Sequence, residues 1–395
     1  MNLRASQLLR IRKLWIVPIV IVGIVVALTA SIYFGSVVDP VGHMHGLPVM
    51  VVDQDSGPAG GKIVAALQSP SPVTSRLKLQ PASLQHAQDV MDRGGAFATL
   101  VIPAGFSTAP ARVQVLENSR LGSLGVNLAV GVLTPATAKI SPKTVVTPTQ
   151  YRPLPSHSAL GLSAFYVSLL AIMAGFLAAT IINSSIDGAF GYATTELGGR
   201  WSQRRPLPVN RRQTLLTKWA VAVVAAPILT AIVLVMAVGV LGMYAPNVVE
   251  LWLLLTLAAM MVSFGTLALL AAFGSVGQML AMVLLVYLSL ASSGGTVPID
   301  ALPGLFKVVG HVEPLRNVLA GARAIVYFGG RGDAGLTSSV IVIALELVFW
   351  AAVGFGVTSW YDHRKLYRLS PEMLEVVHRA IDERLTPAGA GAAVD

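Results

Sequence analysis

Six long apolar segments, separated by polar stretches, constrain the fold of this chain more than any other feature. Each is near the roughly 20 residues that a helix needs to cross the ~30 Å hydrocarbon core of a bilayer, although the fifth is short. Only 12% of the residues are charged, about half the share in a soluble domain. We therefore predict a polytopic α-helical membrane protein. Its six transmembrane helices are expected at about Leu14–Val38, Ala159–Ile186, Leu215–Tyr244, Glu250–Phe273, Met279–Ser292 and Thr337–Tyr361.

Basic residues predict how these helices are oriented. Lys and Arg accumulate on the cytoplasmic side of membrane proteins. The chain begins with a basic stretch, so its N-terminus is expected inside. Six crossings then place both termini in the cytoplasm, including the tail 362–395, and we expect a bacterial plasma (inner) membrane. The strongest positive cluster lies in or next to the loop Asp187–Lys218, at Arg200, Arg204, Arg205, Arg211, Arg212 and Lys218.

The first apolar run is interpreted as a transmembrane helix, not as a cleaved signal peptide. A signal peptide has an apolar core of roughly 7–15 residues followed by a small-x-small cleavage site. The run ending near Val38 is longer, and no such site follows it. Residues 1–38 therefore form a cytoplasmic N-terminus and the first helix. The net charge of +9 lies largely in the cytoplasmic segments and predicts contact with membrane lipid, not with nucleic acid.

A soluble insert separates the first two helices, at residues 39–156. Short strands alternate with helices in this insert, which is typical of a small α/β domain. Because it lies between an outward and an inward crossing, the domain is expected outside the membrane. Residues Pro142, Pro148, Pro153 and Pro155 predict a stiff, extended connector at its end. The expected strands are Leu47–Asp53, Arg76–Gln80, Gly95–Ile102 and Arg112–Leu116, and the expected helices are Ala59–Gln68, Ala82–Arg93 and Ser119–Ile140.

The stretch 292–328, between the fifth and sixth helices, is too polar to be another span. It opens with Gly294 and Gly295, breaks at Pro298, and becomes amphipathic after Pro314, with apolar residues at helical spacing on one face. We expect this element on the outer surface of the membrane, or as a shallow re-entrant hairpin. An ordinary solvated loop helix is the alternative.

Three stretches carry a family resemblance. Val51–Gly57 reads VVDQDSG, Ala96–Ser107 reads AFATLVIPAGFS, and Ser292–Arg323 contains S-G-G, then P, L-P and P, and a final Arg. Together with the order of one helix, a large insert and five more helices, they resemble the ABC-2 type membrane subunits of ABC exporters. The similarity is greater to the YhgE/Pip and nitrosoguanidine-resistance-like branches of that group.

The resemblance implies a transport subunit that works with other chains. Two copies would pair as a homodimer, a separate ABC ATPase would dock on the cytoplasmic loops, and lipid-like or drug-like amphipathic molecules would leave along the dimer interface. The substrate path would include Gly294, Gly295 and Pro298. The loop Asp187–Lys218 would hold the helix that couples to the ATPase, with the candidate residues Glu196, Arg200, Arg204, Arg205 and Pro206.

Glu346 is the one ionisable residue within the body of a predicted span. It lies about nine residues into the sixth helix, roughly 13 Å deep at 1.5 Å per residue. A charge at the bilayer centre costs about 2.5 kcal/mol or more, so this carboxyl should face the bundle or a wet cavity, or be protonated. Two interpretations remain open: a substrate-path or proton-linked carboxylate, or a carboxyl hydrogen-bonded to a neighbouring helix.

No pattern in the sequence predicts an enzyme, a cofactor or a metal site. Gly60–Lys62 resembles the end of a phosphate loop, but Ile63 stands where Ser or Thr would hold Mg²⁺. Asp53, Asp55 and Gly57 form half of a calcium loop without its later Glu, and we expect a strand-end Asx turn there. The chain has no Cys, which excludes disulfides and thiolate metal sites.

The sequence therefore predicts a membrane conduit. Residues 157–361 would contain helices two to six of an ABC-2-like permease subunit that exports amphipathic molecules and is energised by a separate ATPase. The alternative is a cell-envelope scaffold or receptor that transports nothing and binds a partner through its external domain. Proton-driven export is a third hypothesis, which rests on Glu346 alone.

Overall fold

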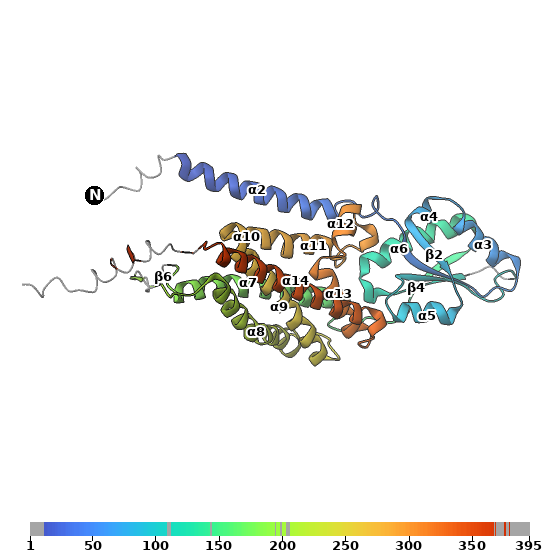
Figure 1. Ribbon diagram of the computed structural model, residues 1–395. Helices are drawn as coiled ribbons and strands as arrows, with labels where there is room; N and C mark the ends of the chain where they lie inside the picture. The colour runs from blue at the N-terminus through green and yellow to red at the C-terminus, as the bar shows by residue number, and fades with distance from the viewer. Residues whose placement is uncertain are drawn as a thin grey trace, which may run out of the picture. The chain divides into compact units, whose positions relative to one another are not determined.

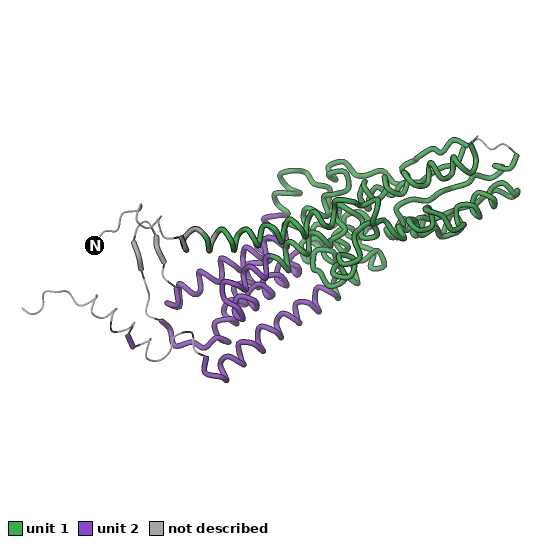
Figure 2. The backbone as a smooth tube through the Cα atoms, turned by 90° about the horizontal axis from the view of Figure 1, so that it is seen from above, with its two compact units in different colours: residues 1–169, 234–254, 283–341 green, residues 170–233, 255–282, 342–395 purple. Residues whose placement is uncertain are grey.

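The chain divides into two compact units. The computed structural model describes residues 12–108, 112–142, 144–193, 195–197, 200–202, 206–366, 368, 375–376 and 379 (Figure 1). Unit 1 comprises residues 1–169, 234–254 and 283–341, and unit 2 comprises residues 170–233, 255–282 and 342–395 (Figure 2).

Seven helices in the described part of the chain are long and apolar enough to cross a membrane, judged by length and composition. Six had been expected, and the additional candidate is α6, which the sequence analysis assigned to the inserted domain. Two of the seven contain π-helical turns, η3 and η4. The candidates are α2 (Arg12–Val37), α6 (Ser123–Ile140), α7 (Ser163–Ala189), α8 with η3 (Arg211–Leu234, Val235–Val240), α9 (Val248–Phe273), α10 with η4 and α11 (Ser275–Ala281, Met282–Leu288, Ser289–Ser292) and α14 (Leu336–His363).

Between α2 and α7, unit 1 contains a five-stranded sheet in the order β2-β1-β3-β4-β5. Neighbouring strands are parallel except β3 and β4, which are antiparallel. The expected strands are present, with β1 at the predicted bounds. The strands are β1 (Leu47–Asp53), β2 (Leu77–Pro81), β3 (Ala98–Ile102), β4 (Arg112–Glu117) and β5 (Val145–Gln150).

Strand β5 is a difference from the sequence analysis, which expected a proline-rich connector there. Val145 pairs with Arg112 of β4, and Gln150 pairs with Glu117. Pro148 lacks an N–H, but an edge strand has one unpaired side and tolerates this loss. The segment is therefore the parallel edge of the sheet.

Helices cover both faces of the sheet (Figure 1). The helices α3 (Pro58–Gln68), α4 (Pro72–Arg76) and α6 lie on one face, and α5 (Leu84–Asp92) lies on the other. Alternate residues of β1 serve the two cores: Val49 packs with α3 and α6, while Met50 packs with α5. A strand buried on both faces reads as a continuous apolar run, which explains why β1 was visible in the sequence.

Helix α6 packs against this sheet although its hydropathy suits a membrane span. Its residues Ala129 and Leu133 have no exposed surface and belong to the same core cluster as Val113 and Val115 of β4. A side chain at Gly125 would overlap the ring of Phe97. The burial of one face of α6 against the sheet therefore accounts for part of its apolar character.

The element after α11 folds as expected but is more buried. It contains η5 (Ile299–Ala301), α12 (Gly304–Val309) and α13 (Pro314–Tyr327), and Pro314 occupies the first turn of α13. Its apolar face is fully buried, and Ser289 of α11 accepts a hydrogen bond from the N–H of Leu315 (2.8 Å). The opposite face is half-buried instead of exposed. Helix α13 is thus an interior helix of unit 1, because segments distant in sequence cover it.

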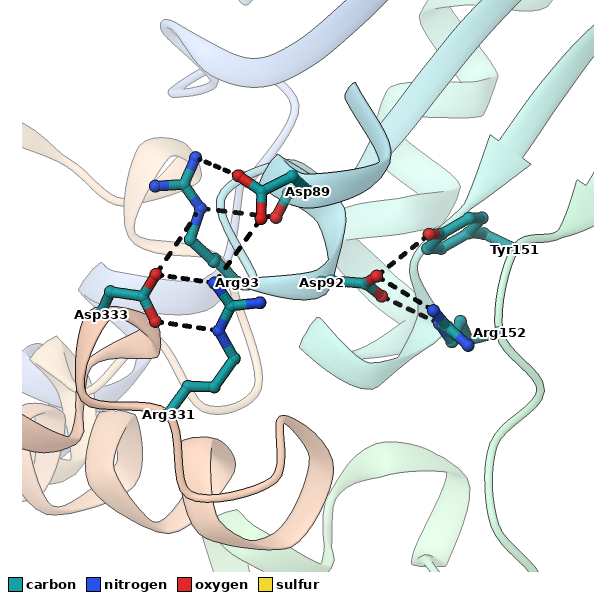
Figure 3. Close-up of polar contacts among 7 residues, drawn as sticks. All are labelled: Asp89, Asp92, Arg93, Tyr151, Arg152, Arg331 and Asp333. Atoms are coloured by element: carbon teal, nitrogen blue, oxygen red, sulfur yellow. Dashed lines mark hydrogen bonds and ion pairs between the residues drawn. The ribbon is translucent and has the colours of Figure 1, made fainter. Parts of the chain in front are cut away.

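A network of charged side chains joins α5 to the loop before α14 (Figure 3). Arg331 Nη2 lies 2.8 Å from Asp333 Oδ2 and 3.5 Å from Asp89 Oδ1. Arg93 lies 3.0 Å from Asp89 and 4.0 Å from Asp333. These side chains are partly exposed, so each single pair contributes little, but a connected network holds geometry better than an isolated pair.

Close helix packing in unit 2 depends on small residues. A Cβ at Gly175 of α7 would lie only 2.5 Å from the carbonyl oxygen of Ala259 in α9, and Ser263 Oγ donates a hydrogen bond to the Gly175 carbonyl (2.9 Å). Trp219 of α8 stacks on Phe264 of α9 with ring centroids 4.7 Å apart. Small residues allow such approach between membrane helices.

We expect Gly175→Val to destabilise the protein by about 1–3 kcal/mol, because the added carbons must displace the α9 backbone. The measurement is the melting temperature of the purified chain in detergent. Gly356→Val is the matched control, since Gly356 lies in the α14 candidate span and no neighbouring atom of the described residues lies within 4 Å of its Cβ position. Equal melting temperatures for the two variants would contradict the packing described here.

Candidate functional site

The Gly294–Gly295 turn is the most constrained backbone in the predicted substrate path. Gly294 has φ +71°, a conformation that favours glycine, and a Cβ there would lie 2.6 Å from Ile299. A Cβ at Gly295 would overlap the ring of Phe165. Both positions therefore require glycine, because the backbone passes directly against neighbouring side chains. Ser293 Oγ accepts the N–H of Gly295 (3.1 Å) and completes the turn.

The guanidinium of Arg323, on α13, lies against this turn. Its Nη2 is 3.4 Å from the carbonyl oxygens of both Gly294 and Gly295, at the long end of hydrogen-bond distances. Its Nε is buried and has no hydrogen-bond partner among the residues that the structure describes. Burial lowers the pKa of Arg323 to about 10, so the group stays charged at neutral pH. The turn is thus held by a cation whose hydrogen-bonding capacity is incompletely used.

Tyr327, one turn further along α13, connects this region to two other segments. Its hydroxyl lies 2.7 Å from Ser163 Oγ at the start of α7 and also donates to the carbonyl of Ser158 (3.3 Å). The backbone carbonyl of Tyr327 accepts a hydrogen bond from Arg120 Nη1 (3.0 Å). Arg120 belongs to η1 (Ser119–Leu121). Helix α13 therefore links the α/β part of unit 1 to the beginning of α7.

A cavity of about 300 Å³ adjoins the Gly-Gly turn. Its volume is at the lower end of the range of small-molecule pockets. One wall is Leu121–Gly125 with Asn127, at the start of α6, and the other is Gly294–Thr296 with Pro298. The structure thus brings the predicted residues Gly294, Gly295 and Pro298 together around one space, and it adds the α6 wall, which sequence reasoning missed.

Glu346, the fourth predicted path residue, belongs to unit 2. Its side chain is half-buried, and Oε1 is enclosed without a hydrogen-bond partner among the described residues. The expected alternative of a carboxyl hydrogen-bonded to a neighbouring helix is therefore not observed in the described part of the chain.

The loop between α7 and α8 was expected to hold a coupling helix. Its described residues instead include a two-stranded hairpin, β6 (Thr195–Leu197) and β7 (Arg200–Ser202), in which Glu196 pairs with Trp201. The side chains of Glu196 and Arg200, and all of Arg204 and Arg205, lie outside the described residues. Pro206 is buried.

A buried ion cluster in unit 2 was missed by the sequence analysis, which counted Lys218 with the basic residues of the loop. Lys218 is 3% exposed, and its Nζ lies 2.7 Å from both Asp187 Oδ1 and Asn183 Oδ1. Arg368 also donates to Asp187. Asn183 and Asp187 are four residues apart on α7 and share one face, which is the signal that could have indicated a common partner. Removing Asp187 would leave a buried charge unpaired, which is costly.

The Asp-rich turn after β1 is structural. Asp53 Oδ1 accepts the N–H of Asp55 (3.0 Å), which is the expected Asx turn. The carboxylate of Asp55 accepts hydrogen bonds from the Ser107 hydroxyl and from the N–H of Gly60. The hydrogen bond from Ser107 holds the pKa of Asp55 below its ordinary value. Among the described residues, no three His, Asp or Glu side chains gather as metal ligands would.

The described helices define a multi-pass membrane protein, and its candidate site is the enclosed Gly294–Gly295 turn with the small cavity beside it. A family model described as ABC-2 family transporter protein matches residues 14–355. The chain therefore belongs to the ABC-2 transporter family, whose members are transport subunits and not classical enzymes and work with an ABC ATPase. No curated protein and no solved structure matches the chain.

We expect Gly295→Ala to loosen the Gly-Gly turn, because its methyl group would overlap the ring of Phe165. Hydrogen–deuterium exchange should rise about tenfold or more in peptides covering residues 292–298, as a local loss of about 1.4 kcal/mol would produce. Gly304→Ala is the matched control in the same element, since no neighbouring atom in the described part of the chain lies within 4 Å of its Cβ position. Unchanged exchange in Gly295→Ala would show that the turn is not held by this contact.

Proposed function

We propose that this chain is the permease subunit of an exporter that moves lipid-like or drug-like amphipathic molecules outward, energised by a separate ABC ATPase. The observation that carries the proposal is the family match over residues 14–355. In this proposal the separate ATPase binds the nucleotide, so the chain itself needs no nucleotide site. The position of Gly60–Lys62 supports this view, because these residues lie inside α3 instead of forming a phosphate-binding loop.

In the proposed topology, six helices cross the membrane and both termini are cytoplasmic. The packing of α6 on the sheet supports leaving this helix out of the count. Residues 39–156 would then form an external α/β domain between the first two crossings. The π-helical turns of η3 and η4 lie within candidate spans, and such turns are frequent at functional sites.

The proposed substrate path includes the cavity at Gly294, Gly295 and Pro298. Irregular backbone within a membrane protein is tolerated where other parts of the protein cover it or where it lines a cavity. The Gly-Gly turn packs against Phe165 and also lines the cavity. Glu346 would contribute a carboxyl to the path in unit 2. Its enclosed oxygen without a described partner supports a role other than helix packing.

The loop Asp187–Lys218 is the proposed link to the ATPase, through Glu196, Arg200, Arg204, Arg205 and Pro206. Hydrogen bonds connect the two ends of this loop to neighbouring segments. Tyr192 donates to the carbonyls of Leu207 (2.8 Å) and Val209 (3.0 Å). The carboxylate of Asp362 accepts the first N–H groups of α8 (3.0 Å). Through these hydrogen bonds, a movement of the loop imposed by the ATPase would be transmitted to α7 and α8.

Two copies of the chain are proposed to pair, as in related exporters, within the YhgE/Pip or nitrosoguanidine-resistance-like branch. Helix α2 supports this pairing, because its side chains are largely exposed and apolar. Membrane lipid would cover the apolar side chains of α2 that the partner copy does not contact.

The proposed topology predicts opposite labelling of two introduced cysteines, since the chain has no native Cys. Gln68→Cys on α3 should react with a membrane-impermeant maleimide in intact cells, and Leu207→Cys should react only after permeabilisation. Both positions are exposed. Ala138→Cys on α6 should behave like Gln68→Cys. The reverse pattern would invert the orientation and remove the proposed ATPase link.

The proposed function predicts that an ABC ATPase co-purifies with the full chain in mild detergent and that the complex, in proteoliposomes, moves a fluorescent phospholipid or ethidium in an ATP-dependent way. Glu346→Gln should reduce this transport at least tenfold without loss of the ATPase, whereas Glu250→Gln, at an exposed position, should not. Failure to recover any ATPase or transport would favour the non-transporting scaffold or receptor. Transport that persists without ATP but stops with an uncoupler would favour proton-driven export.

A further inference from the structure

An apolar groove in the α/β part of unit 1 is unrelated to the Gly-Gly turn. Its volume is about 430 Å³, within the range of small-molecule pockets. Its lining residues come from the region of α3 and α4 and from the second half of α6, and these helices lie on one face of the sheet (Figure 1). From Gly131 to Lys139 it follows α6 for roughly 12 Å at 1.5 Å per residue.

The walls of this groove are apolar. Leu67, Val73, Val132, Ala136 and Ile140 line it, and all five belong to or pack against the core cluster beneath the sheet. Helix α6 is apolar on this side as well as on the side buried against the sheet. A contiguous apolar surface left open on a folded domain commonly marks a binding site, so the groove side of α6 calls for an apolar occupant.

Two cations border the groove. Arg76 in the last turn of α4 and Lys139 in the last turn of α6 both line it. No carboxylate or other hydrogen-bonding group among the described residues pairs with either side chain. Elsewhere in the same domain exposed arginines do find carboxylates, as Arg152 does with Asp92 (2.9 Å; Figure 3). The groove therefore combines an apolar surface with unpaired positive charge.

We propose that this groove binds a long-chain fatty acid, with its acyl chain along α6 and its carboxylate at Arg76 and Lys139. A carboxylate accepts charge-assisted hydrogen bonds from both groups, in a two-point geometry from Arg. Burying the apolar surface of the acyl chain stabilises binding. The volume suits one chain better than the two chains of a phospholipid. This site is separate from the proposed substrate path and does not depend on transport.

The test uses the full chain in phosphatidylcholine nanodiscs and palmitic acid carrying a chain diazirine and a terminal alkyne. After illumination, labelled peptides are identified by mass spectrometry. We expect label in the peptides that contain residues 66–76 and 131–140. Unmodified palmitate should compete at least tenfold better than hexadecanol, which has the same chain without the charge.

Two pairs of variants separate the groove from non-specific labelling. Arg76→Gln with Lys139→Gln should reduce groove labelling about tenfold or more, as expected for lost hydrogen bonds to a charged group, whereas Arg112→Gln, on the opposite face of the sheet, should not. Gly131→Trp should block the groove, because the Gly131 Cβ position faces open space. Gly61→Trp is its control, at a helical glycine with equally open surroundings outside the groove.

Three results would overturn the proposal. The first is the absence of label in the groove peptides of a chain whose melting temperature is unchanged. The second is equal competition by palmitate and hexadecanol, which would indicate an apolar surface facing lipid or inserted in it. The third is efficient cross-linking between copies through Ala136→Cys, which would indicate that a second copy of the chain covers the groove.

Discussion

A bilayer core offers no hydrogen-bond partners to the peptide backbone, and this constraint orders most of the chain. Long helices satisfy their own backbone groups, so the candidate spans can be almost purely apolar. The irregular Gly-Gly turn is possible because other parts of unit 1 enclose it. Phe165 fills the space that a side chain at Gly295 would need, and Arg323 lies beside the carbonyl oxygens of Gly294 and Gly295.

The buried cations connect the fold to the proposed function. Arg323 and Lys218 are each enclosed, but they differ in how many of their N–H groups have hydrogen-bond partners. Lys218 has a carboxylate and an amide oxygen at 2.7 Å and contributes to a fixed cluster. Arg323 has two long contacts, its Nε has no partner among the described residues, and the Gly-Gly turn that it contacts lines a cavity. A fully paired cation suits a structural role, whereas an incompletely paired cation behind a turn that lines a cavity suits the proposed path for the polar parts of a substrate.

Local patterns predicted local structure well. The run Leu47–Asp53 is continuously apolar because β1 is buried on both faces, and its bounds were correct. Pro314 marked the start of α13. Strand β5 was missed because its burial is slight, so it has no apolar alternation, and because Pro148 is normally excluded from strands. The burial of α13 was missed because residues far away in sequence, such as Ser289, cover it.

The sequence by itself determined that this is a multi-pass membrane protein of the ABC-2 type. Hydropathy is averaged over neighbouring residues, and each motif is a pattern within a short segment, so both can be recognised without the tertiary structure. It also indicated Gly294, Gly295 and Pro298 as a unit. Only the tertiary structure decided that Arg323 contacts the turn, that Lys218 pairs with Asp187, and that α6 packs on the sheet with an apolar groove beside it. Those features depend on pairs of groups many residues apart, and a close approach in space leaves no signature in the local composition of either segment.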